Sequence, residues 1–550
     1  MARSFLKSSL ENATFNIVFQ ILFRCITFVL NAFVLRYVSQ AVVGVMNVRL
    51  LLLESTILYL SREAFRRACL SKTTEHNWAQ VVNLLWLTVP LCQLCCLVFG
   101  YVWLHVLEPP SEDITQHYAL GVWSICVSCV VEMCCEPVYL VSQAFLFVRL
   151  KVVLDTALVL VRTAIFVPLI VHSPNRAVVA FSVAQLASAT VYSLGFYAYF
   201  YAYIRDRNRR AALRKKDGPA PADDPDDDFP FRSLYDFLPA KVDGLPPIDR
   251  RLAALTWSFF KQGVLKQVLT EGERYVMTVS SVLSFREQGM YDVVNNLGSL
   301  AARFLFRPVE DAAYFYFSQM VHRDASIQEQ NQKHMAESSG VLRRLLRCIA
   351  SLGLVILVFG QSYATLLLAL YGGARLARGP GPVLMRFHCL SVLLLAVNGI
   401  TECYAFATMS TGQLDRYNLL MAVLSVSFLF VSWALTTLLG GVGFILANCC
   451  NMAARIAHSV IFIRDKYSST AYNPLSGLVP GRLFLLALFA AGVVTKISEE
   501  YLFEDHKLLH LCIGAASFAV VLLSWAYEER ELVALGVGKW RQRRASLKQD

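Results

Sequence analysis

Long apolar segments alternate with short polar ones along the whole chain. A helix that crosses a bilayer needs about 20 mostly apolar residues, and the pattern predicts about fourteen such helices. They cover residues 14–35, 40–60, 80–104, 117–147, 152–172, 178–204, 254–283, 288–320, 341–371, 383–410, 416–438, 440–463, 480–497 and 508–527. Three of these, 40–60, 254–283 and 288–320, are weak candidates by hydropathy alone. The pattern therefore predicts an all-α polytopic membrane protein.

Composition and charge agree with a membrane protein. Hydrophobic residues make up 56% of the chain and charged residues only 17%, against about 25% charged in soluble proteins. A net charge of +11 could indicate a nucleic-acid partner, but the basic residues lie in short clusters between apolar segments. Such clusters are typical of cytoplasmic loops. With fourteen spans, the basic clusters fall on one side of the membrane and the acidic loops 108–113 and 499–507 on the other, so both termini are predicted to be cytoplasmic. No nucleic-acid partner is expected.

One long segment does not resemble a membrane helix. Residues 205–251 are charged and rich in proline, a composition typical of a flexible cytoplasmic linker. The linker separates an N-terminal lobe of six helices, residues 1–204, from a C-terminal lobe of eight, residues 252–527. Residues 528–550 are predicted to form a basic cytoplasmic tail.

The two lobes share a small sequence pattern. Gly44 and Arg62 are 18 residues apart in the second helix of the first lobe, and Gly289 and Arg307 are also 18 apart in the second helix of the other. Repeated halves are typical of transporters, whose substrate site lies at the repeat interface. We therefore predict two pseudo-repeated lobes around a central cavity.

Charged residues inside the predicted spans indicate what this cavity would bind. An ionisable side chain at the bilayer centre costs at least about 2.5–3.5 kcal/mol, so it is expected to face a bundle interior or a wet cavity. The basic ones concentrate in the first two helices of each lobe. Arginine matches phosphate oxygens with a planar fork of donors, so we predict a cationic cavity for phosphate or pyrophosphate. Its candidate residues are Arg24, Arg62, Lys266, Glu273, Arg274, Asp292, Arg303 and Arg307.

Several charged residues have two interpretations. Arg62 and Arg307 either line the cavity or extend toward the cytoplasmic surface, and Arg66 is expected to be an interfacial cytoplasmic charge. Glu132 and Glu136, one helical turn apart, form either a proton or cation site or structural pairs with basic residues. Glu402 has the same two interpretations.

The stretch from residue 258 to residue 285 decides the topology. On a helix of 100° per residue, Lys266, Thr270, Glu273 and Arg274 fall within an arc of about 100°. This pattern predicts an amphipathic membrane helix over residues 254–283, with its polar face toward a water-filled cavity. Without this helix, the charge asymmetry of every later loop would be inverted.

The sequence carries no motif for catalysis. No phosphate-binding GxxxxGK[ST] motif occurs, and we find no hydrolase, zinc or dinucleotide motif. The predicted loops opposite the cytoplasmic side are too short for a glycosyltransferase surface, and most cysteines lie within apolar segments, where packing is their expected role. We predict no enzyme activity, no catalytic residue, no metal and no cofactor.

Long segments of the chain resemble a known family. FRCITFVLNAFVLRYVS (23–39), NVRLLLLESTILYLSREAFRRACLS (47–71), TWSFFKQGVLKQVLTEGERYVMT (256–278) and YDVVNNLGSLAARFLFRPVED (291–311) are similar to the eukaryotic Man5GlcNAc2-PP-dolichol translocation protein family. The likeness extends over nearly the whole chain apart from the linker and the tail. It implies a MurJ/MATE-like fold of the multidrug/oligosaccharidyl-lipid/polysaccharide exporter superfamily in the endoplasmic reticulum membrane.

The resemblance also implies a function. The chain would move the dolichol-pyrophosphate-linked Man5GlcNAc2 intermediate of N-glycosylation from the cytoplasmic to the lumenal leaflet, in contact with membrane lipids and with other N-glycosylation machinery. We expect alternating access, with the pyrophosphate held by the cationic cavity. One alternative is an ion-coupled exporter of small cations, which would depend on Glu132, Glu136 and Glu402. The other is a non-transporting accessory scaffold.

Overall fold

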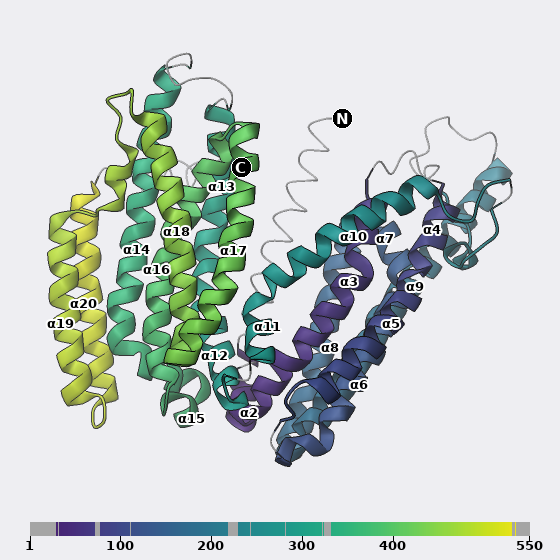
Figure 1. Cartoon of the computed structure of the whole chain (residues 1–550), viewed down its shortest axis with the longest axis horizontal. Helices are drawn as coiled ribbons and strands as arrows, with labels where there is room; N and C mark the ends of the chain where they lie inside the picture. The colour runs from purple at the N-terminus through teal and green to yellow at the C-terminus, as the bar shows by residue number, and fades with distance from the viewer. Residues whose placement is uncertain are drawn as a thin grey trace. The chain divides into compact units, whose positions relative to one another are not determined.

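The structure is a computed structural model of the whole chain (Figure 1). It describes residues 29–530 apart from 31, 72–76, 111, 218–228, 243, 281, 322, 324–329 and 331, together with residue 534. All regular elements in this part are helices, with no strand. Eleven helical stretches of the described chain are long and apolar enough to cross a membrane, namely Gln40–Cys69, Trp78–Val106, His117–Cys134, Arg149–His172, Pro174–Arg210, Gln332–Gly372, Gly381–Thr408, Gly412–Leu439, Gly441–Tyr467, Pro474–Leu502 and Lys507–Glu528. The prediction of an all-α polytopic membrane protein is confirmed.

The exact number of spans stays a prediction. The weak candidate at 40–60 is among the eleven. The span predicted at 14–35 lies largely outside the described residues. The segments 254–283 and 288–320 are largely helical, but they are too polar to count as spans by composition.

The chain divides into two compact units, Met1–Gly289 and Met290–Asp550. The helices of the first unit are α2 (Gln40–Val43), η1 (Gly44–Leu50), α3 (Leu51–Cys69), α4 (Trp78–Trp86), α5 (Thr88–Tyr101), η3 (Val102–Val106), α6 (Glu112–Cys134), α7 (Glu136–Ala144), α8 (Val148–His172), η4 (Pro174–Arg176), α9 (Ala177–Asp217), η5 (Leu234–Phe237), α10 (Arg250–Thr270) and α11 (Gly272–Val279). α12 (Phe285–Gly298) begins in the first unit and continues into the second. The lobe boundaries derived from the linker stay a prediction.

The second unit contains the remaining helices. They are η6 (Ala302–Phe306), α13 (Arg307–Met320), α14 (Gln332–Gly372), α15 (Ala374–Ala377), α16 (Gly381–Thr408), α17 (Thr411–Leu439), α18 (Gly441–Tyr467), η7 (Pro474–Leu478), α19 (Arg482–Leu502) and α20 (Lys507–Glu528). Its core lies where α13, α14 and α16 meet, around the buried Phe317, Leu342 and Tyr404. α19 and α20 pack side by side beside α14 (Figure 1).

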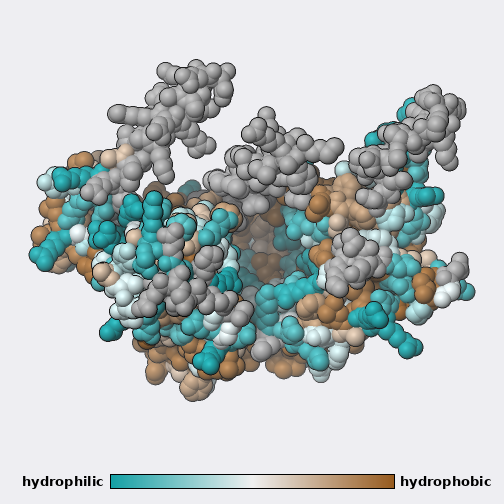
Figure 2. Space-filling view, turned by 90° about the horizontal axis from the view of Figure 1, so that it is seen from above, coloured by the Kyte–Doolittle hydropathy of each residue, from teal (hydrophilic) through white to brown (hydrophobic). Residues whose placement is uncertain are grey.

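Many large apolar side chains point outward from these helices. Leu438, Phe489 and Leu523 are 78%, 73% and 70% exposed. Hydrophilic residues gather at the helix ends and hydrophobic residues appear on the flanks in the view from above (Figure 2). Large exposed apolar surfaces are typical of membrane contact sites, so this distribution agrees with a membrane environment.

The helix predicted over residues 254–283 is two helices. α10 ends at Thr270 and α11 begins at Gly272, because Glu271 between them has φ −98° and ψ 14°, outside the α-helical region. The Glu271 carboxylate accepts hydrogen bonds from Ser55 Oγ at 3.1 Å and from Arg274 Nη1 at 3.2 Å. The prediction that Lys266 and Arg274 share one face of a continuous helix was therefore wrong, since the two residues lie on different helices.

The segment 205–251 contains more structure than its composition indicates. α9 continues through Asp217, and Phe229, Phe231 and Phe237 are at most 5% exposed. The rings of Phe231 and Phe237 stack with centroids 4.5 Å apart. Thus the described end of the predicted linker is anchored to the first unit by aromatic packing.

Candidate functional site

Two of the buried acids in the first unit are held by arginines of α3. Arg62 Nη1 donates to Glu132 Oε2 at 3.1 Å. Arg66 forms a two-pronged pair with Glu136, one arm of which joins Nη2 to Oε2 at 2.8 Å. The guanidinium of Arg66 also lies 3.8 Å from the ring centroid of Tyr139. Both acids are thus engaged in ion pairs, which favours the structural interpretation over a free ion site.

A further polar cluster lies closer to the N-terminal end of α3. Gln185 Nε2 donates to Glu54 Oε1 at 2.8 Å and to Ser128 Oγ at 3.2 Å. Arg162 Nη2 lies 3.5 Å from the same Glu54 oxygen. One face of α3 is therefore fastened to α6, α8 and α9 by neutralised charges, as expected for ionisable groups in a bundle interior.

Another face of α3 packs against α10 and α11. Thr56 Oγ1 and Tyr275 Oη are 2.6 Å apart, and Gln267 Nε2 donates to Ser55 Oγ at 3.2 Å. Lys266 is exposed on α10 and has no acidic partner among the described residues. Glu273 and Arg274 are half-buried on α11. Of the predicted cationic residues that the structure describes in this unit, Lys266 is therefore the one available to a ligand.

The second unit carries a polar strip along α12 and the helices after it. Asp292 is 6% exposed, Asn296 Nδ2 donates to its Oδ2 at 3.0 Å, and Arg303 Nη2 donates to Asn296 Oδ1 at 3.2 Å. Arg303 lies in η6, a π-helical segment, and such segments are frequent at functional sites. The Arg307 side chain is 73% exposed, with Asp311 Oδ1 at 3.3 Å. Arg303 and Arg307 thus present their charge at the surface of the unit.

Glu402 lies in a separate buried cluster of the second unit. Its carboxylate accepts from Tyr417 Oη at 2.6 Å and from Asn398 Nδ2 at 3.0 Å, and it pairs with Arg455. The predicted acid is therefore fully engaged, like Glu132 and Glu136.

The structure separates the predicted residues into groups. Arg62, Lys266, Glu273 and Arg274 belong to the first unit, whereas Asp292, Arg303 and Arg307 belong to the second. Arg24 lies outside the described residues. The described part of the chain contains no group of three or more His, Cys, Asp or Glu that could hold a metal.

Sequence reasoning missed the role of Arg66. It was expected to be an interfacial charge, but its side chain is 17% exposed and it neutralises Glu136. The available signal was Glu136 itself, because an acid at helix depth requires a cation or a proton.

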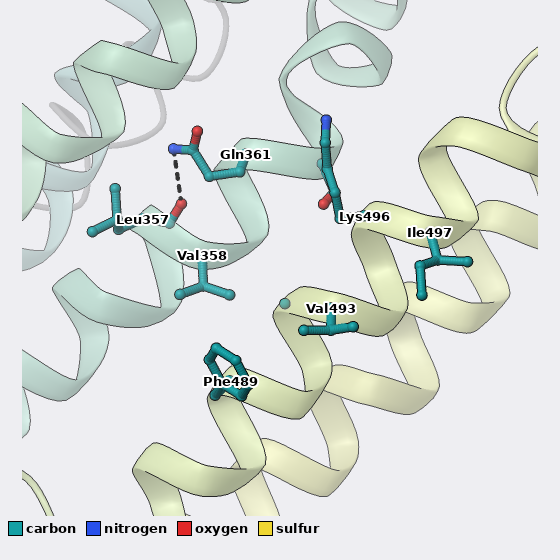
Figure 3. Close-up of a pocket in the computed structure, with 9 residues that line it drawn as sticks. Leu357, Val358, Gln361, Phe489, Val493, Lys496 and Ile497 are labelled. Atoms are coloured by element: carbon teal, nitrogen blue, oxygen red, sulfur yellow. Dashed lines mark hydrogen bonds between the residues drawn. The ribbon is translucent and has the colours of Figure 1, made fainter.

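A groove in the second unit has a different character. It lies between α14 and α19, has a volume of about 430 Å³, and is lined mainly by apolar side chains such as Val358, Phe489 and Val493 (Figure 3). Gln361, Ser362 and Lys496 are the polar residues of its lining. Its apolar lining does not suit a diphosphate, so the groove is not the predicted cationic site.

The helical architecture and the neutralised charges inside it are those of a polytopic membrane protein. The solved structure of the lipid II flippase MurJ in an inward closed conformation superposes with a TM-score of 0.59 at 11% identity, covering 94% of this chain and 100% of that one. The family model of the Rft protein matches residues 8–538. The chain belongs to the Rft-1 family.

Curated relatives match over nearly their full length. The protein named "Man(5)GlcNAc(2)-PP-dolichol translocation protein RFT1" of Drosophila melanogaster is 47% identical over 98% of this chain and 99% of its own. Proteins of the same name from Xenopus tropicalis and Mus musculus are 43% and 42% identical, each covering 94% of its own length. The family resemblance noted in the sequence is confirmed.

Proposed function

We propose that this chain translocates Man5GlcNAc2-PP-dolichol from the cytoplasmic to the lumenal leaflet of the endoplasmic reticulum membrane. Membership of the Rft-1 family over residues 8–538 supports this substrate, because full-length relatives are named for it. The flippase fold of the structural neighbour supports translocation rather than catalysis, and we propose no enzyme activity. Both termini face the cytoplasm in this proposal.

The observation that carries the mechanism is the contrast between engaged and available charges. Glu132, Glu136 and Glu402 each have an arginine partner. Lys266, Arg303 and Arg307 are exposed, and of these only Arg307 has a carboxylate partner among the described residues, Asp311 at 3.3 Å. The helices that carry them are not among those apolar enough to count as membrane spans. In this proposal the three side chains supply the positive charge of a polar path, because the buried acids Glu132, Glu136 and Glu402 are already occupied by other arginines.

A diphosphate suits that charge. Each hydrogen bond between a charged donor and a phosphate oxygen contributes about 1.5–3 kcal/mol, and arginine provides two parallel donors. The pyrophosphate and glycan therefore occupy the polar path while the dolichol chain stays in the hydrocarbon. Arg24, Arg62, Arg274 and the polar residues Glu273 and Asp292 complete the proposed path.

Alternating access completes the proposal. The path opens first to the cytoplasm and then to the lumen, and net flux follows the substrate gradient. An ion-coupled exporter of small cations would need an available acid at helix depth. The arginine pairs of Glu132, Glu136 and Glu402 argue against that function.

A glutamine scan tests the proposal in cells that depend on this gene. Lys266, Arg303 and Arg307 are replaced singly and together, and the lipid-linked oligosaccharides are profiled. The proposal predicts accumulation of Man5GlcNAc2-PP-dolichol and underglycosylated proteins, most strongly for the triple variant. A normal profile in the triple variant at wild-type protein level would contradict the cationic path.

A further inference from the structure

A polar pocket lies in the second unit, apart from the residues considered above. It has a volume of about 480 Å³. Arg343, Arg344 and Arg347 of α14 line one side, and Glu528, Glu529 and Arg530 at the end of α20 line the other.

The pocket lies at the level where three membrane spans begin or end. α14 has 41 residues and is about 62 Å long, against about 30 Å for the hydrocarbon core, so its arginine-rich first third extends beyond the core. α19 begins at Arg482 and α20 ends at Glu528. At such a level the lipid headgroups are expected.

Both acids of the pocket are already engaged. Glu529 is 9% exposed, and its Oε1 accepts from Arg347 Nη1 at 2.9 Å. Glu528 accepts the backbone N–H groups of Leu483 at 2.8 Å and Phe484 at 3.1 Å, which are the free donors at the start of α19. A Cβ at Gly481 would overlap the Glu528 carboxylate, so the glycine leaves room for this cap.

Four arginines face two carboxylates in this pocket, so a net positive charge remains. Arg343, Arg344 and Arg530 have no acidic partner among the described residues. Arg344 Nε donates only to the backbone oxygen of Gly340, at 3.2 Å. In addition, Arg347 Nε is buried without a hydrogen-bond partner among the described residues, although a buried donor left unpaired costs about 1–3 kcal/mol.

We propose that this pocket binds the phosphate-bearing headgroup of an anionic membrane lipid. Three arginines provide the bidentate donors that phosphate oxygens prefer. A phosphate at this position also neutralises the excess charge. The site is independent of the proposed translocation path, and it serves a resident lipid of the leaflet in which the pocket opens.

The test uses the purified full-length protein in nanodiscs. One set contains phosphatidylcholine alone, and another contains phosphatidylcholine with phosphatidic acid. Bound lipids are counted by native mass spectrometry after release, and thermal unfolding is followed in parallel. We expect phosphatidic acid to be retained in preference to phosphatidylcholine and to raise the unfolding temperature.

Variants identify the pocket. The double variant R343Q/R530Q should lose about tenfold or more in phosphatidic acid affinity, since each lost charged hydrogen bond is worth about a factor of ten. R343K/R530K keeps the charges and should retain most of the binding. Arg416→Gln, an exposed arginine at the start of α17 in the same unit, is the matched control and should bind like the wild type.

Three outcomes would overturn the proposal. The first is wild-type retention by R343Q/R530Q. The second is an equal loss in Arg416→Gln, which would indicate diffuse attraction to positive charge. The third is full replacement of the lipid by inorganic phosphate at equal concentration, which would assign the pocket to a soluble anion.

Discussion

η1 and α12 cross at Gly44 and Gly289, where their backbones are in contact. A Cβ at Gly44 would lie 2.9 Å from the Gly289 nitrogen, and a Cβ at Gly289 would lie 2.8 Å from the Gly44 nitrogen. Each would lie still closer to a backbone oxygen, that of Phe285 or that of Gln40. These are the two glycines that the sequence pattern placed at equivalent positions of the predicted repeats, and each has the small size that the crossing requires.

Replacing either glycine by alanine should loosen this crossing. Backbone atoms cannot move aside as a flexible side chain can, so we expect a loss of about 1–3 kcal/mol, typical of overpacking. Thermal unfolding of purified Gly44→Ala and Gly289→Ala measures it. Gly412→Ala is the control, because a Cβ there meets nothing within 4 Å; equal stability of all three variants would contradict the crossing.

The Arg66–Glu136 pair should be a major contributor to the stability of the first unit. Breaking a buried pair costs about 3–5 kcal/mol, because one charge is left uncompensated. Glu136→Ala should therefore lower the unfolding temperature strongly, and the double variant Arg66→Met/Glu136→Gln should recover most of the loss. Asp206→Ala, which breaks an exposed pair with Arg210, should change stability by less than about 1 kcal/mol. A small effect of Glu136→Ala would mean that the pair does not form.

The loop that follows α9 should depend on Asn83. Asn83 Nδ2 donates to the backbone oxygens of Ala240 at 2.8 Å and Pro247 at 2.9 Å, and its Oδ1 accepts from Ala240 N at 2.9 Å. Asn83→Ala removes all three bonds, so trypsin should cleave faster at Arg232 and Lys241. Asn77→Ala, which removes only the cap of α4, provides the comparison. Unchanged cleavage in Asn83→Ala would show that aromatic packing alone holds the segment.

Lys266 and Lys261 offer a matched pair on α10. Both are exposed, but five residues separate them by about 140° around the helix. We expect Lys266→Gln to weaken substrate binding by about tenfold or more, the value of a charged hydrogen bond to phosphate, and Lys261→Gln to behave like the wild type. Binding of a pyrophosphate-linked lipid to the purified variants decides between them. Equal effects of both changes would indicate a nonspecific charge contribution.

The Glu402 cluster separates glycolipid translocation from ion coupling. In the double variant Glu402→Gln/Arg455→Met no uncompensated charge remains, so the protein should fold and keep its flux. A carboxylate that coupled transport to an ion gradient could not be removed in this way. Loss of flux in the folded double variant, together with gradient dependence in the wild type, would support the exporter alternative.

Local composition was sufficient to predict the membrane class and the strongly apolar spans, because each span carries its own signal. It could not predict pairings such as Arg66 with Glu136, which depend on how helices of distant sequence pack. The aromatic residues of FPFRSLYDF were hidden by the average composition of the segment around them. The break at Glu271 was missed because the carboxylate that stabilises it finds its partner on α3.

Reconstitution of the purified protein into liposomes tests the central claim most directly. Man5GlcNAc2-PP-dolichol is placed in one leaflet, and its appearance in the other is followed by accessibility to an added mannosidase. The account predicts protein-dependent translocation that falls sharply when Lys266, Arg303 and Arg307 are all replaced by glutamine. Translocation no faster than in protein-free liposomes, with correctly folded protein present, would contradict the account and support an accessory scaffold.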